Sequence, residues 1–141
     1  GLFAGAVAIA LAMVMSAVGG MEIWFPMKLM ATPILGSFAT ESGANVSAIV
    51  VGFLFIEALC AFWGFVYAHF TPTNQLSVLL AMGVVWGLFS WIFQWNLFWQ
   101  SFRTIYAAHI SPAAAFPICL TYGISLTVVA FFDRALRGSR H

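Results

Sequence analysis

Charge is what this sequence has least of. Among its 141 residues, 5 are Lys or Arg and 4 are Asp or Glu, so charged residues make up 6%. An average soluble domain carries roughly 25% charged residues, and a soluble chain this apolar would expose too much hydrophobic surface to stay dispersed. The net charge is +1, which gives no basic field for a nucleic acid. The scarcity of charge therefore excludes a soluble domain and a nucleic-acid-binding protein.

Residues that catalyse reactions or bind metals are also scarce. Cys60 and Cys119 lie in apolar runs without a CxxC pair or a histidine at ligand spacing, so we interpret them as small apolar residues. His69 and His109 fall at opposite ends of predicted spans, roughly 30 Å apart, and cannot share one haem or metal. No nucleotide-binding, metalloprotease or serine-hydrolase motif occurs. We therefore predict no catalytic residues, no metal and no cofactor, which disfavours an enzyme without excluding one.

Long apolar runs are what the chain does have, because 63% of its residues are hydrophobic. They predict an all-α, multi-pass integral membrane protein, since the runs are continuous and lack the alternation of a β-barrel. Short connections favour a single transmembrane domain over 1–141, folded as an antiparallel four-helix bundle. Residues 24–38, with Pro26 and Pro33, are predicted to form an interfacial helix or re-entrant turn. The predicted spans are 2–19, 46–70, 76–99 and 113–132.

Basic residues set the expected orientation. Arg134, Arg137 and Arg140 follow the fourth predicted span, whereas Lys28 and Arg103 belong to the opposite side. The positive-inside rule then places both termini in the cytoplasm. We expect the three C-terminal arginines to anchor the chain to lipid head groups.

Glu57 is the most informative single residue, because it lies near the middle of the second predicted span. An ionised carboxylate there costs about 2.5–3.5 kcal/mol even on the lenient insertion scale. One interpretation is a proton- or cation-binding site. The other is a protonated acid bonded to Ser90 or Tyr122, or a contact with a partner subunit.

Small and polar residues form stripes on two of the predicted spans. Glu57 shares a helix face with Gly64, and the third span carries four small or polar residues at the same offsets. We expect the two stripes to face each other across the turn at residues 71–75, with the glycines allowing close helix packing. Gln94 begins a polar and aromatic segment that could hold a polar ligand or quinone head group, or form an aromatic belt. The stripe on the third span is Gly83, Gly87, Ser90 and Gln94.

The chain resembles small uncharacterised bacterial inner-membrane proteins of the YagU-like kind. The resemblance rests on the Gly-rich first span, the Trp24-Phe25-Pro26 segment, the stretch from Gly83 to Trp91 and the exit from Phe132 to Arg137. It implies a bacterial inner-membrane location. That family offers no established catalytic residues to transfer to this sequence.

Two functional hypotheses follow from these patterns. The first is a non-catalytic accessory subunit that packs against a larger membrane complex, with membrane lipids and other subunits as its partners. The alternative is a small homo-oligomeric transporter or channel in which Glu57, helped by Ser90, Gln94 and Tyr122, couples protons or cations. Glu22 and Lys28 could clamp a substrate, but we interpret them as solvated charges on an interfacial helix.

Overall fold

A computed structural model describes residues 1–43, 45–71, 75–94 and 111–138, with the backbone alone at 112 and 133–138. Within these ranges the chain is helical and contains no strand, so the predicted all-α class is confirmed. The elements are α1 (Leu2–Val18), α2 (Phe25–Leu35), the 3-10 helix η1 (Gly36–Thr40), α3 (Val46–Phe70), α4 (Leu76–Phe93) and α6 (Pro112–Gly138).

Three helical segments in the described part are long and apolar enough to cross a bilayer. They are Val46–Phe70, Leu76–Phe93 and Ala113–Phe132. The chain is thus a multi-pass membrane protein. The first helix, Leu2–Val18, is also apolar but has 17 residues, which gives it a length of about 25 Å.

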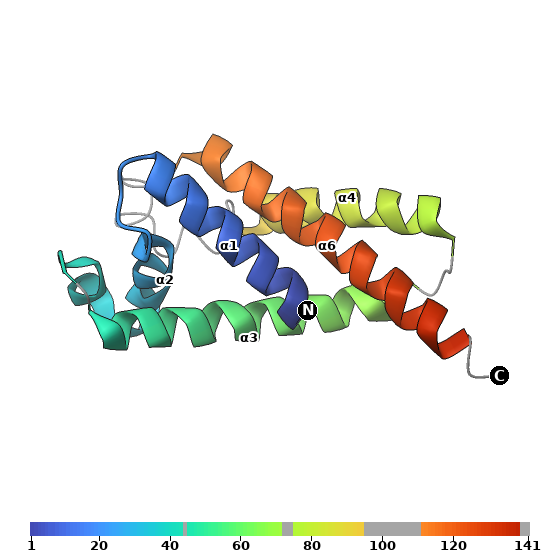
Figure 1. Cartoon of the computed structure of the whole chain (residues 1–141), viewed down its shortest axis with the longest axis horizontal. Coiled ribbons are helices and arrows are strands. Elements are labelled where there is room, and N and C mark those ends of the chain that lie inside the picture. Colours follow the sequence, from blue (N-terminus) through green and yellow to red (C-terminus); the bar gives the residue numbers. More distant parts are fainter. Residues whose placement is uncertain (44, 72–74, 95–110, 139–141) are drawn as a thin grey trace.

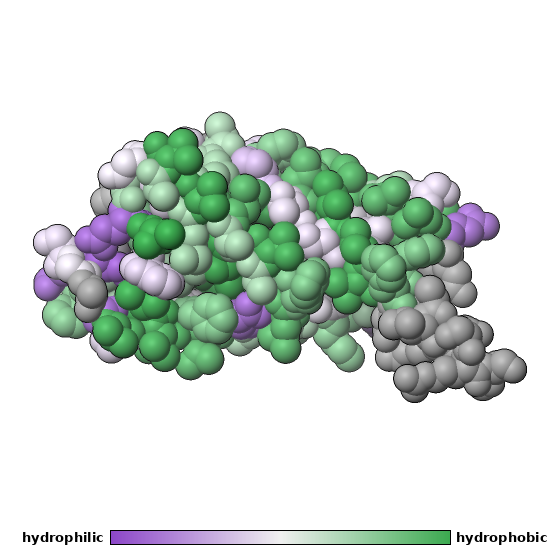
Figure 2. Space-filling view, viewed as in Figure 1, coloured by the Kyte–Doolittle hydropathy of each residue, from purple (hydrophilic) through white to green (hydrophobic). Residues whose placement is uncertain are grey.

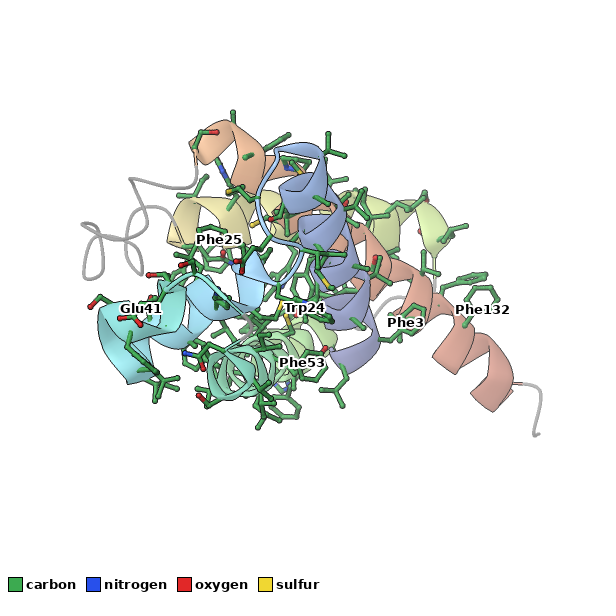
Figure 3. All side chains as sticks on the ribbon, turned by 60° about the vertical axis from the view of Figure 1, so that its left-hand side comes forward. Phe3, Trp24, Phe25, Glu41, Phe53 and Phe132 are labelled. Atoms are coloured by element: carbon green, nitrogen blue, oxygen red, sulfur yellow. The ribbon has the colours of Figure 1, made fainter. Side chains whose placement is uncertain are left out.

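The long helices alternate in direction (Figure 1). In that view α3 and α6 run from left to right, α1 and α4 run back, and α2 and η1 lie at the left-hand end. The space-filling view is mostly hydrophobic, and hydrophilic residues gather at the end formed by α2 and η1 (Figure 2). Figure 3 shows Phe3 and Phe132 directed outward near the opposite end from Glu41. Such an outer surface suits contact with hydrocarbon.

The 11-residue helix α2 packs tightly on the first half of α3. A methyl group added at Gly52 of α3 would overlap the carbonyl of Met27, so the two backbones touch. Leu29 and Ala31 of α2 are fully buried. At about 16 Å, α2 is too short to cross a bilayer. It therefore forms a protein-covered layer at one end of the spans.

Lys28 is the buried hub of this end and is only 1% exposed. Its Nζ donates to Glu22 Oε2 at 2.8 Å and to the carbonyls of Glu41 and Gly43 at 2.7 and 3.0 Å. Glu22 Oε1 also accepts a bond from the Gly43 N–H at 3.3 Å. The interpretation of Lys28 as a solvated charge is wrong, because all three of its protons are bonded inside the protein. These bonds close the connection between α1 and α3.

Candidate functional site: a cavity among the spans

Glycines bring α4 and α6 into direct backbone contact, the most extensive helix pairing in the described part. A methyl at Gly87 would lie 2.9 Å from the carbonyl oxygen of Cys119. One at Gly83 would lie 2.7 Å from the carbonyl oxygen of Gly123 and would overlap Thr127 Oγ1. Both distances are shorter than real Cβ contacts, so these positions accept only glycine at this helix separation.

A buried polar node fixes the same helix pair near the start of α4. Thr127 Oγ1 donates to the carbonyl of Leu79 at 2.9 Å, and the Tyr67 hydroxyl donates to that carbonyl at 3.2 Å. The two hydroxyls also lie 3.2 Å apart. One residue from each of α3, α4 and α6 therefore meets at one point, which sets the register of the three helices.

Aromatic side chains, in contrast, keep α3 and α4 apart. The two helices follow each other in the sequence but make at most marginal backbone contact. Between them, the rings of two α3 residues pack edge-on against rings of α4, with centroids 5.0 to 5.9 Å apart. This aromatic layer consists of Trp63 and Tyr67 from α3 and Trp86, Phe89 and Phe93 from α4.

The closely packed helices α4 and α6 on one side and the aromatic layer on the other leave a central cavity of about 330 Å³. It falls within the size range of small-molecule sites, about 300–1,000 Å³. Described residues of all five α-helices line it, and none of them is Asp, Glu, Lys, Arg or His. Most of the lining is aliphatic, from Ala8 and Ile9 of α1 to Ile118 of α6. The cavity is a mainly apolar, partly open hollow among the described helices.

A few polar groups converge on this cavity. Ser90 lines it and is 5% exposed, and its Oγ has no hydrogen-bond partner among the described residues. The thiol of Cys119 donates a weak bond to Gln94 Oε1 at 3.8 Å. The Tyr122 hydroxyl donates to the carbonyl of Cys60 at 2.6 Å. Ser90, Gln94 and Tyr122, which the sequence singled out from two different spans, thus meet around one space.

Glu57 does not line this cavity. Its carboxyl group lies between α3 and α1, where a methyl at Gly5 would be 3.2 Å from Oε2. Oε2 is buried and has no hydrogen-bond partner in the part of the chain that the structure describes, whereas the residue as a whole is half-buried. The expectation that the Glu57 stripe faces the Gly83 stripe is wrong: α3 presents this stripe to α1, and α4 presents its glycines to α6. Gly64 contacts the start of α1 at Gly1.

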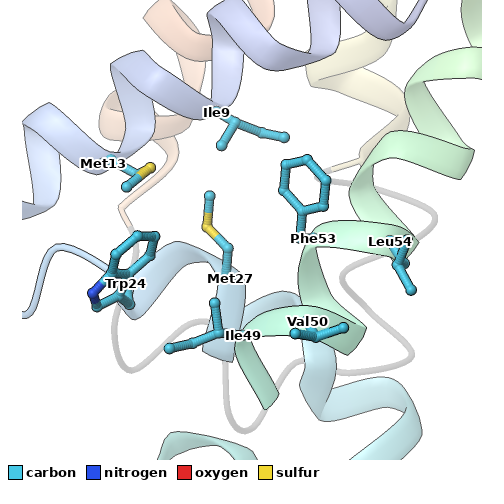
Figure 4. Close-up of a pocket in the computed structure, with 8 residues that line it drawn as sticks. All are labelled: Ile9, Met13, Trp24, Met27, Ile49, Val50, Phe53 and Leu54. Carbon is cyan, nitrogen blue, oxygen red and sulfur yellow. The ribbon is translucent and has the colours of Figure 1, made fainter. Parts of the chain in front are cut away.

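A second hollow of about 280 Å³ lies between α1, the start of α2 and α3. In Figure 4 the side chains of Ile9, Met27 and Phe53 converge on it from the three helices, with Trp24 at its edge. Its lining is wholly apolar in the described part and offers no group that would orient a ligand. It suits a lipid chain packed against the protein.

Several residues considered from the sequence fall elsewhere. Arg134 and Arg137 lie in the last turns of α6, where only the backbone is described. Arg140, Arg103 and His109 lie outside the described residues, as do Trp95 and Trp99.

Cys60 and Cys119 are free thiols on the cavity wall. In the described part of the chain, no three His, Cys, Asp or Glu side chains come together as a metal site would require.

Two features of the site escaped the sequence analysis. The contribution of α1 to the cavity leaves no motif, since it consists of alanines, Ile9, Met15 and Ser16. The sequence carries only a weak signal for the hydrogen bonds of Lys28, namely a single cationic residue in an apolar stretch. A membrane protein rarely leaves such a residue unpaired.

Comparisons with known proteins add no family to this description. No family model, no curated protein and no solved structure matches the chain.

Proposed function

We propose that the chain is a non-catalytic accessory subunit that packs against another membrane protein in a bacterial inner membrane. In this proposal α1 is a fourth span, completing an antiparallel bundle with both termini in the cytoplasm. The observation that carries it is the placement of Glu57. One oxygen of this acid is buried against α1 and has no hydrogen-bond partner among the described residues, whereas the residue as a whole is half-buried.

The physical reason is the cost of leaving an acid in contact with hydrocarbon. Glu57 lies near the middle of α3, a helix of 25 residues that is about 37 Å long. At that depth water is absent, and the acid needs a hydrogen bond from protein. Nothing in the described part of this chain supplies one to Oε2. Oε2 itself is enclosed by this chain, so a neighbouring subunit with a hydroxyl, amide or basic side chain at mid-membrane depth would bond the carboxyl group through the part of the side chain that is still exposed.

Purification from a native source in mild detergent tests the proposal. The wild-type chain should recover other membrane proteins in fixed stoichiometry. Glu57→Gln, which keeps hydrogen-bonding atoms, should retain most of that association, and Glu57→Leu should lose it. Glu41→Gln provides the matched control, because Glu41 is exposed near η1. Recovery of the chain as a lone monomer or a homo-oligomer would contradict the accessory role.

The alternative, a small transporter or channel, is favoured by the cavity that the five described α-helices surround. Glu57 would have to reach this cavity to act as a coupling group, although its neighbours Ile56 and Cys60 line it and Glu57 does not. Flux measurements in liposomes separate the two functions. Coupling through the carboxyl predicts pH-dependent flux that Glu57→Gln abolishes, the opposite of the tolerance expected for an accessory subunit.

A further inference from the structure

The unpaired hydroxyl of Ser90 is the starting point. A serine within a helix usually satisfies its hydroxyl on the carbonyl four residues earlier, here that of Trp86. Ser90 Oγ makes no such bond and is buried. Buried hydroxyls are nearly always bonded, because an unpaired one in apolar surroundings loses the hydrogen bonds it had with water. A hydroxyl left unpaired on a cavity wall therefore points to a missing partner in that cavity.

The surroundings limit what this partner is. The described lining offers no charged side chain, so an ion would lose its hydration without compensation. Most of the wall is aliphatic and suits a hydrocarbon tail. Two of its polar residues lie on one wall, where Ser90 and Gln94 are neighbours one helical turn apart at the end of α4. Both offer hydrogen-bond donors to an oxygen atom.

We propose that the central cavity binds a neutral amphiphile, with its hydroxyl or carbonyl head group held by Ser90 and Gln94 and its apolar tail lying along α1 and α2. A cavity of about 330 Å³ holds a single chain or ring, and is too small for a whole phospholipid. The same chemistry is found in long-chain alcohols derived from lipids and in quinones with apolar tails. This binding is independent of the accessory role, because the cavity lies within one chain.

Photolabelling tests the proposal directly. The full chain is placed in phosphatidylcholine nanodiscs with a dodecanol that carries a diazirine in its tail, and adducts are mapped by mass spectrometry. Adducts should fall on cavity-lining residues such as Met30 and Ile118, and Ser90→Ala should weaken binding about tenfold. The control is Ser77→Ala, an exposed serine on the same helix, which should leave labelling unchanged. Labelling confined to lipid-facing residues such as Phe65, or insensitive to Ser90→Ala, would overturn the proposal.

Thermal unfolding without ligand separates binding from structure. If the Ser90 hydroxyl bonds only to a ligand, Ser90→Ala leaves the melting temperature of the ligand-free protein unchanged or raises it, because the variant removes an unsatisfied buried group. If Ser90 instead supports the fold, Ser90→Ala lowers the melting temperature, and labelling falls only in proportion to the loss of folded protein. That result refutes a ligand role. Ala12→Phe, which places a ring in the cavity from α1, should block labelling while the protein stays folded.

Competition identifies the source of the head group. A benzoquinone with a decyl tail and unlabelled dodecanol are each added against the photoprobe. Stronger displacement by the quinone assigns an isoprenoid-type quinone, and stronger displacement by the alcohol assigns a lipid-derived alcohol. Dodecanoate at pH 8 supplies the charged comparison. Displacement by the anion as strong as that by dodecanol would refute the neutral head group.

Discussion

Replacing Gly83 by alanine should separate α4 from α6. The added methyl would lie 2.7 Å from the carbonyl oxygen of Gly123, whereas ordinary Cβ contacts begin at 3.4 Å. Relief of this contact alone requires the helices to move apart by about 0.7 Å, the difference between those two distances. The bond from Thr127 Oγ1 to the Leu79 carbonyl, 2.9 Å long, would then stretch beyond hydrogen-bonding range.

The expected change in the free energy of unfolding is the sum of opposing contributions. A gap of 0.5–1 Å forfeits about a quarter to a half of the dispersion energy of each contact across it, and overpacking typically costs about 1–3 kcal/mol. Loss of the Thr127 bond adds about 1 kcal/mol. Alanine regains about 1 kcal/mol through its higher helix propensity. We therefore expect Gly83→Ala to lower the free energy of unfolding by about 1–3 kcal/mol.

Unfolding by increasing mole fractions of SDS in mild detergent, followed by circular dichroism, measures this change. Ala81→Val is the matched control, because it adds volume on the exposed face of the same helix. The control should leave the midpoint within experimental error. A midpoint for Gly83→Ala equal to or above that of the wild type would show that the close approach of α4 and α6 contributes nothing to stability.

Three further predictions concern bonds described above. Lys28→Met should lower the free energy of unfolding by about 1–3 kcal/mol in the same assay, because two backbone carbonyls lose their donor; wild-type stability would contradict the role of this hub. The pKa of Glu22 lies below its ordinary value of 4.5, first through the bond from Lys28 and then through that from the Gly43 N–H. Its contribution to stability is therefore complete above about pH 4.5 and is lost as the pH falls through the lowered pKa, so acid should reduce the melting temperature less in Glu22→Gln than in the wild type. Tyr122→Phe should cost about 1 kcal/mol through the lost bond to the Cys60 carbonyl, and an unchanged SDS midpoint would show that this bond is energetically neutral.

Helix positions could be predicted well because they depend on local chemistry. Continuous apolar runs of spanning length fix where helices form, and α3 has the bounds predicted for the second span. Asn45 caps that helix by accepting a bond from the Ala48 N–H at 3.2 Å. Within α2, Pro26 occupies the first turn, where its missing N–H is not needed. Signals of this kind act over a few residues and can be read directly from the sequence.

Helix pairing could not be predicted, because a stripe of small residues shows that a helix can pack closely but not which neighbouring helix packs on it. The stripe on α3 and the glycines of α4 have matching offsets, which favoured a pairing that the structure does not have. The deciding factor is the bulk of Trp63 and Trp86, whose rings lie 5.9 Å apart between α3 and α4. The sequence singles out Ser90 and Tyr122 as polar residues within apolar runs, but only the tertiary arrangement shows that both line one cavity.

The difference between the two sides of α4 has a mechanical consequence. On one side the backbones of α4 and α6 are in direct contact at Gly83 and Gly123. We therefore expect these two helices to move together as one rigid unit. On the other side α3 and α4 meet mainly through the edges of aromatic rings, and the bond from the Tyr67 hydroxyl to the Leu79 carbonyl joins them near the start of α4. We therefore expect relative helix movement to occur between α3 and α4 more readily than between α4 and α6, and to change the width of the cavity beside Trp63.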